Sequence, residues 1–171
     1  MNEQLLEQLE LYLAENYIAP VETDAKYSIG AREEPKDKYD GVLGAIRWEI
    51  DKLFDRLDLE DTFSSHLFKL IKQKGMTEVE VYKKVHLDRR LFSKLRRDRN
   101  YHPNRRTIWM IALSLELNLE ELKELLKAAG YYFFAHDKED IIMRFFFENQ
   151  IYDLFTINEI LDYYGFEPLG N

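Results

Sequence analysis

The segment "LFKLIKQKGMTEVEVYKKVHLDRRLFSKLRRD", residues 67–98, contains parts of three short helical patterns joined by tight connections. The second pattern opens with a capping box between Thr77 and Glu80, and Asp88 is the expected cap of the third. Only the turn Val85–Leu87 separates these two patterns. Two short helices joined in this way are typical of a helix-turn-helix, so the segment predicts one.

The pattern that follows Asp88 divides into two arcs when it is drawn at about 100° per residue. Leu91, Phe92 and Leu95 fall on the apolar arc. The other arc holds only basic and polar residues: Arg89, Arg90, Ser93, Lys94, Arg96 and Arg97. We therefore expect one face of this helix to pack inward and the other to present a row of cations.

The basic residues are concentrated in one part of an acidic chain. The 171 residues carry a formal net charge of −8, yet the stretch 66–106 holds 13 Lys and Arg against 4 Asp and Glu. That stretch has a net charge of +9, which leaves −17 for the rest of the chain. Such asymmetry indicates a positive surface on an acidic body, and a positive surface favours contact with phosphate.

Helical periodicity dominates the sequence, and only 7 Gly and 4 Pro interrupt it. We therefore predict an all-α protein. The predicted parts are an N-terminal amphipathic helix (1–19), a polar linker (20–40), a connecting helix (41–61), a helix-turn-helix domain (62–130) and an aromatic-rich helical extension (131–171). The N-terminal helix carries a leucine stripe, so it must pack on the body or on a partner.

Residues 62–130 resemble the lambda-repressor-like (XRE-type) helix-turn-helix domains of bacterial and phage regulators. The segment quoted above carries the resemblance, together with "IALSLELNLEELKELL" at residues 111–126. The resemblance implies a lambda-repressor-like five-helix core with an N-terminal helical arm and a C-terminal helical extension. The stretch that begins at Met76 and the aromatic tail resemble an uncharacterised bacterial helical module.

The resemblance also implies a function, in which the helix 88–97 enters the major groove of double-stranded DNA. The residues expected to contact bases are Arg89, Arg90, Ser93 and Lys94. The residues expected near phosphates are Thr77, Lys83, Lys84, Arg97, Arg99, Asn104, Arg105 and Arg106. The expected activity is sequence-specific regulation of transcription. We expect a homodimer, because one recognition helix reads too few bases for useful specificity.

Three positions differ from the family pattern, and they favour an alternative. Glu78 stands where the family usually has a neutral residue, Tyr82 where it favours a small one, and His86 where it usually has glycine. A carboxylate at position 78 would repel an approaching phosphate. The alternative is a protein-interaction adaptor that reuses this fold and docks an acidic partner on the basic face.

No motif of a catalytic or metal centre stands out in the sequence. There is no cysteine, and no Gly-rich loop ends in the Lys-Ser/Thr of a phosphate-binding motif. The four histidines form no HxxxH pair: His66, His86, His102 and His136. We expect no catalytic residue, cofactor or metal. The lack of cysteine fits the cytoplasm, and no apolar run is long enough for a membrane span.

The extension 131–171 contains twelve aromatic residues, which either complete the core or form a surface for a dimer or protein partner. The stretch "MRFFFENQIYDLF", residues 143–155, holds too many neighbouring aromatics for a single buried stripe. We therefore expect some of these side chains to meet another surface.

Overall fold

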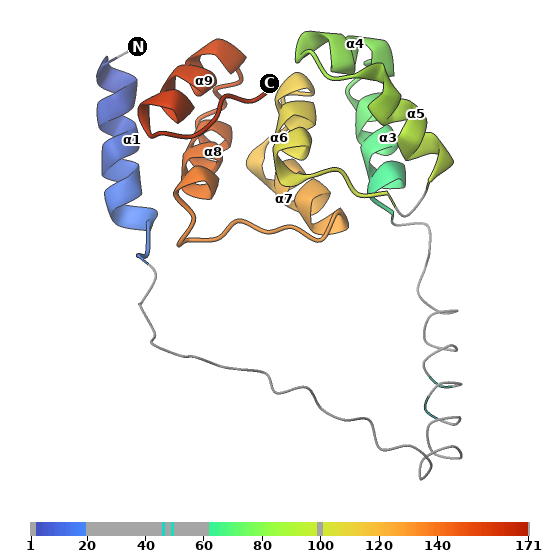
Figure 1. Ribbon diagram of the computed structural model, residues 1–171, viewed down its shortest axis with the longest axis horizontal. Helices are drawn as coiled ribbons and strands as arrows, with labels where there is room; N and C mark the ends of the chain where they lie inside the picture. Colours follow the sequence, from blue (N-terminus) through green and yellow to red (C-terminus); the bar gives the residue numbers. More distant parts are fainter. Residues whose placement is uncertain (1–2, 20–45, 47–48, 50–61, 99–100, 171) are drawn as a thin grey trace. The chain divides into compact units, whose positions relative to one another are not determined.

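Eight helices form the described part of the chain in the computed structural model, which covers residues 3–19, 46, 49, 62–98 and 101–170 (Figure 1). Their bounds are α1 Glu3–Asn16, α3 Phe63–Gln73, α4 Glu78–Lys84, α5 Arg89–Arg97, α6 Arg105–Ser114, α7 Leu119–Ala128, α8 Lys138–Glu148 and α9 Leu154–Tyr163. No strand occurs among these residues. The all-α prediction is confirmed. No helix within the described ranges has both the length and the apolar character needed to cross a membrane.

Local side-chain hydrogen bonds define where the helices from α3 onward begin. In each of them the residue before the helix accepts a hydrogen bond from a backbone N–H of the first turn, and each such cap contributes about 1 kcal/mol. The capping residues are Thr62, Thr77, Asp88, Asn104, Asn118, Asp137 and Asp153. Thr77 and Asn118 form complete capping boxes. The caps predicted at Thr77 and Asp88 are confirmed.

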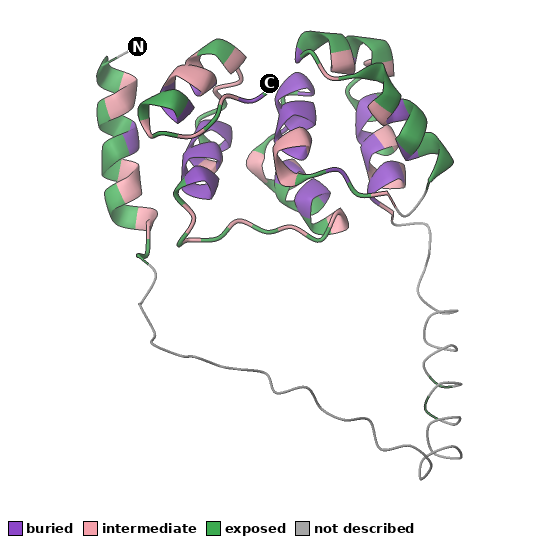
Figure 2. Ribbon diagram, in the orientation of Figure 1, coloured by how far each residue is buried: buried purple, intermediate pink, exposed green. Residues whose placement is uncertain are grey.

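Two helices, α6 and α8, are largely buried (Figure 2). Every residue from Ile108 to Ser114 in α6 is buried, and so is every residue from Glu139 to Met143 in α8. A helix that is buried around most of its circumference needs neighbours on several sides. The helix α6 packs against α4 and α7, while α8 packs against α1, α7 and α9.

The position of α8 decides which aromatic residues of the extension belong to the core. Phe145, Phe146 and Phe147 are at most 3% exposed, although they are consecutive in the sequence. They are buried together because α8 is enclosed by three other helices. Phe155, in the same stretch of sequence, is 72% exposed. Part of the stretch 143–155 therefore completes the core, and whether its exposed part meets another surface stays a prediction. The exposed aromatic residues of the extension are Tyr132, Phe134, Phe155 and Tyr163.

The N-terminal helix α1 packs on the body of the protein. Leu9 is fully buried, and the ring of Tyr12 meets that of Phe145 edge-on with 5.3 Å between centroids. The Tyr12 hydroxyl donates a 2.6 Å hydrogen bond to the Glu148 carboxylate. The leucine stripe of α1 was expected to pack either on the body or on a partner. The described contacts of α1 are with the body.

The chain divides into two units, residues 1–20 with 61–171 and residues 21–60. In the first unit a single hydrophobic core includes residues of α1, of α3 to α7 and of the extension. Position 130 is therefore no boundary between separate cores. The predicted linker 20–40 and connecting helix 41–61 lie outside the described residues, apart from Ile46 and Glu49, which are helical.

Candidate nucleic-acid interface

The turn between α4 and α5 sets the direction of the basic helix. His86 adopts a left-handed backbone with φ of 56°, a conformation that glycine adopts more readily than other residues. The Leu87 N–H then donates a 2.9 Å hydrogen bond to the Tyr82 carbonyl and ends α4. The Tyr82 ring itself lies 6.1 Å from that of Phe92, so this large side chain forms part of the contact between the two helices.

The helix α5 has the two faces that its sequence predicts. Phe92 and Leu95 are at most 2% exposed, and Leu91 is half-buried. The exposed residues are those of the basic and polar arc: Arg89, Arg90, Ser93, Lys94, Arg96 and Arg97. The predicted separation of apolar and cationic residues is confirmed. The buried pair anchors α5, and the cations therefore stand on a fixed surface.

The predicted base-contacting residues differ in how they are held. The guanidinium groups of Arg89 and Arg90 form no ion pair with any described residue. The Lys94 ammonium lies 3.8 Å from the centroid of the Tyr101 ring. A cation–π contact at an exposed site contributes about 0.5–1 kcal/mol and restricts the lysine. Tyr101 could not be predicted as part of this surface, because nothing in its spacing indicates that the loop after α5 returns to Lys94.

The carboxylate of Glu78 has a partner on α5. Arg96 donates a hydrogen bond to it, and the two groups form an ion pair. The hydrogen bond to Glu78 raises the pKa of the Arg96 guanidinium. The acidic group that argued against phosphate contact is therefore balanced by a cation of the basic helix itself.

The predicted phosphate-contacting residues differ in whether their side chains already have partners. Lys83 and Arg97 are exposed, and neither forms an ion pair with a described residue. The Lys84 ammonium lies 2.6 Å from the Glu116 carboxylate, in a pair whose two side chains are about half exposed. Thr77 and Asn104 use their side-chain oxygens to cap α4 and α6. Arg99 lies outside the described residues.

The last two predicted phosphate contacts, Arg105 and Arg106, already bind groups of the extension. Arg105 pairs with Asp137 at 2.9 Å and with Asp140 at 2.8 Å, and its guanidinium lies 4.9 Å from the Trp109 ring centroid. Arg106 pairs with Glu139 and donates hydrogen bonds to two backbone carbonyls of the C-terminal tail. The two arginines thus connect α6 to α8 and to the tail, a role that nothing in their sequence positions indicates.

Asp140 is the most deeply placed group of this junction. Its residue is 0% exposed, and burial raises the pKa of its carboxyl to about 6. The hydrogen bond from the Phe134 N–H and the charge of Arg105 act in the opposite direction, but they do not outweigh burial. Burial likewise raises the pKa of Glu139. Asp137, Glu139 and Asp140 therefore form a partly buried charge network with Arg105 and Arg106 at the start of α8.

Comparisons of this chain with protein-family models, with curated proteins and with solved structures found no match. Within the described ranges, no group of three or more His, Asp or Glu side chains is placed to hold a metal ion.

Proposed function

We propose that this protein is a sequence-specific DNA-binding regulator of transcription, with a lambda-repressor-like core and α5 as its recognition helix, acting in the cytoplasm. One observation carries the proposal. The exposed face of α5 presents Arg89, Arg90 and Lys94, while Phe92 and Leu95 anchor the opposite face in the core. A rigid row of cations on a short helix is suited to the major groove.

The chemistry of these side chains favours guanine. Arg and Lys donate to the O6 and N7 atoms of guanine, and a bidentate arginine contact contributes about 1–3 kcal/mol of discrimination. Arg89 and Arg90 have no intramolecular ion pair to break in the described part of the chain before they bind. Lys83 and Arg97 would contact phosphates at the edges of the same surface.

The test is fluorescence anisotropy on a random DNA duplex across a salt series, with the variant Arg89→Glu/Lys94→Glu. Contact with six phosphates gives a slope of log K against log salt of about −5. We expect the variant to lose at least tenfold in affinity. Lys72→Glu/Lys138→Glu is the matched control, because it makes the same charge change at two exposed lysines of α3 and α8 and should lose much less.

The homodimer is part of the proposal, because two α5 helices would read two half-sites. Phe155 and Tyr163 of α9 are 72% and 53% exposed, and they provide a candidate surface for the second copy. Sedimentation equilibrium of the wild type and of Phe155→Asp measures the association. A monomer at all concentrations, free and on DNA, would refute this part.

A second candidate function is an adaptor whose basic face docks an acidic protein. The observation that favours it is that acidic groups of this chain already pair with Lys84, Arg96, Arg105 and Arg106. A folded protein that fails to bind duplex DNA even at low salt would support the adaptor over the regulator. A pull-down that is lost in Arg89→Glu/Lys94→Glu would then identify the partner.

A further inference from the structure

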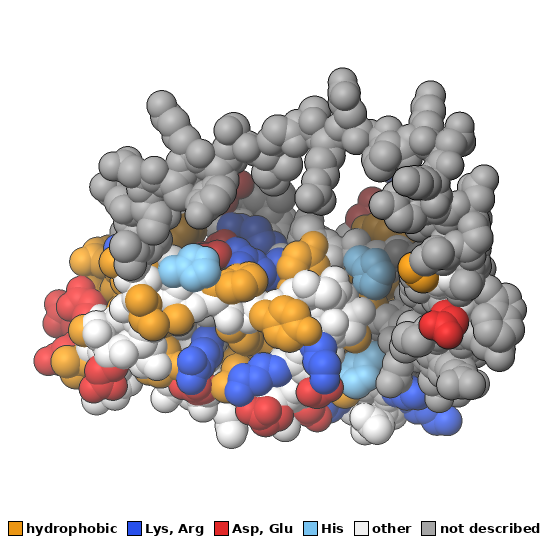
Figure 3. All heavy atoms as spheres, turned by 90° about the horizontal axis from the view of Figure 1, so that it is seen from below, with side chains coloured by type: hydrophobic (Ala, Val, Ile, Leu, Met, Phe, Trp, Pro, Cys, Tyr) orange, Lys and Arg blue, Asp and Glu red, His pale blue; other side chains and the backbone are white. Residues whose placement is uncertain are grey.

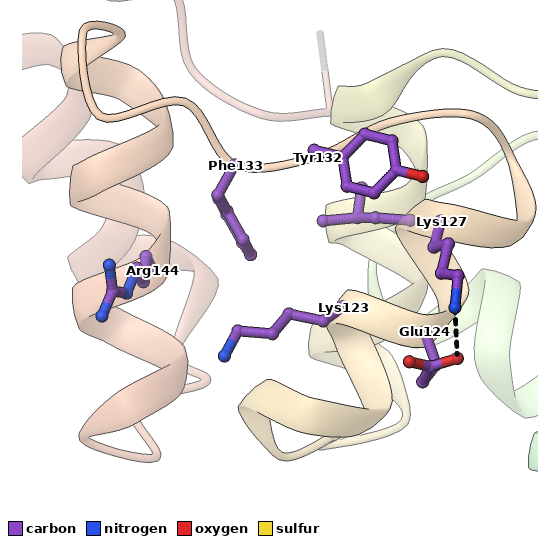
Figure 4. Close-up of a pocket in the computed structure, with 7 residues that line it drawn as sticks. Lys123, Glu124, Lys127, Tyr132, Phe133 and Arg144 are labelled. Atoms are coloured by element: carbon purple, nitrogen blue, oxygen red, sulfur yellow. Dashed lines mark ion pairs between the residues drawn. The ribbon is translucent and has the colours of Figure 1, made fainter.

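A groove of about 390 Å³ lies between α7, the loop that follows it, and α8 (Figure 4). Its lining residues are Lys123, Glu124, Leu126 and Lys127 of α7, Tyr132 and Phe133 of the loop, and Arg144 of α8. Phe133 descends from the loop into the space between the two helices, and Lys123 extends toward it from α7 (Figure 4). None of these residues belongs to α4 or α5, so the groove is a feature separate from the basic helix.

The loop that carries the two aromatic rings is held in place by its backbone. The Tyr131 N–H donates to the Leu126 carbonyl at 2.9 Å, and the Phe134 N–H donates to the buried Asp140 carboxylate at 2.9 Å. The Ala135 carbonyl accepts from the Ile18 N–H at 2.7 Å. Tyr132 and Phe133 lie between these fixed points. The aromatic wall of the groove is therefore preorganised.

The two lysines of α7 are available to an anion. Lys123 pairs with Glu120 at 2.7 Å and Lys127 with Glu124 at 3.9 Å, each three residues earlier on the same helix. Such pairs on an exposed helix surface are weak, so a phosphate group can replace the carboxylate. The Arg144 head group is held by Glu148, and its side chain contributes mainly to the wall.

The part of the groove next to Tyr132 is suited to a flat ring. The Tyr132 side chain belongs to a residue that is 57% exposed, although an aromatic ring of this size gains free energy from burial. On the face seen in Figure 3, hydrophobic side chains (orange) and Lys and Arg side chains (blue) lie next to each other. An exposed aromatic beside cations offers stacking and charge neutralisation to one ligand.

We infer that this groove binds a small ligand with a planar ring and phosphate groups, of the mononucleotide class. The ring would stack on Tyr132 and Phe133. The phosphates would replace Glu120 and Glu124 as the ion-pair partners of Lys123 and Lys127. The volume lies within the range of about 300–1,000 Å³ that small-molecule sites occupy. The inference does not rest on DNA binding by α5.

Isothermal titration calorimetry of the full chain tests it with three probes: ATP, adenosine and inorganic pyrophosphate. We expect ATP to bind at least tenfold more tightly than either fragment, because only ATP engages both halves of the groove. Tyr132→Ala and Lys123→Gln/Lys127→Gln should each weaken ATP at least tenfold. Lys72→Gln/Lys138→Gln, the matched control, should leave the affinity unchanged, and circular dichroism checks that each variant is folded.

Three results would overturn the inference. The first is no ATP binding at millimolar concentration. The second is pyrophosphate binding as tightly as ATP with no effect of Tyr132→Ala, which would indicate a general cationic patch. The third is loss of ATP binding in Arg89→Glu/Lys94→Glu with the lysine variant of α7 unaffected, which would place the ligand on α5. Duplex binding is measured separately, so failure of one proposal leaves the other open.

Discussion

His86 holds a left-handed backbone at the turn before the basic helix, with φ of 56°. Its Cβ is crowded by the adjacent peptide in this region, which costs about 1–2 kcal/mol for a residue other than glycine. Glycine avoids that strain but loses more conformational entropy on folding. We expect His86→Gly to raise the free energy of unfolding by about 0.5–1 kcal/mol, measured by urea denaturation followed with circular dichroism.

His86→Ala is the matched control for this prediction. Alanine keeps the Cβ and its strain but removes the exposed imidazole, so it should be no more stable than the wild type. Equal stability of the alanine and glycine variants would contradict the argument, because it would mean that the turn relaxes away from the left-handed conformation.

At the scale of elements, the junction between α6 and α8 makes stability depend on pH. Asp140 titrates near pH 6 in the folded protein and near 3.9 when unfolded, because burial disfavours its charge. A raised pKa stabilises the folded state below the unfolded pKa, and this contribution is lost as pH rises through the folded pKa. Stability from Asp140 therefore falls between pH 4 and pH 6, by up to about 3 kcal/mol.

Asp140→Asn tests this assignment, because asparagine has nearly the same shape and no charge. The free energy of unfolding of the variant minus that of the wild type should grow as pH rises from 4 to 7. Glu139→Gln is the comparison, because Glu139 also has a raised pKa but pairs with both Arg105 and Arg106 and is 8% exposed, against 0% for Asp140. It should therefore show a smaller change. A stability difference for Asp140→Asn that is constant with pH would contradict the assignment.

At the scale of the whole molecule, the five helices from α3 to α7 depend on the extension. Every residue of α6 from Ile108 to Ser114 is buried. The two arginines at the start of α6 form ion pairs with Asp137, which caps α8, and with Glu139 of α8. The Tyr152 hydroxyl also donates a hydrogen bond to the carbonyl of Leu117, in the connection between α6 and α7. Removing 131–171 would expose apolar surface of the shared core and leave two arginines without partners.

We therefore expect the fragment 62–130 to lack a cooperative thermal transition, while the full chain has one. Near-ultraviolet circular dichroism and the fluorescence of Trp109, which is the sole tryptophan of that fragment, report the loss of packing. A fragment that melts cooperatively within a few degrees of the full chain would show that α3 to α7 form an independent domain.

Features whose causes lie within about four residues could be predicted from the sequence. Thr77, Asp88, Asn104 and Asn118 cap helices because each side chain reaches a backbone N–H two or three residues later. The two faces of α5 follow from the helical repeat, which places Phe92 and Leu95 together and opposite the cations. The all-α class and the exposed basic face of α5 were therefore predictable from the sequence.

Which cations remain available and which aromatic residues are buried depends on contacts between distant parts of the chain. Arg89 and Arg105 have the same side chain, but Arg105 meets Asp137 from 32 residues away and Arg89 meets no described acid. Phe145 is buried because α1 packs over it, with the Tyr12 ring against the Phe145 ring. Tyr12 also donates a hydrogen bond to Glu148, which lies 136 residues away in the sequence. Such contacts depend on how helices pack around a shared core, and no local pattern of hydrophobicity or charge specifies a partner at that distance.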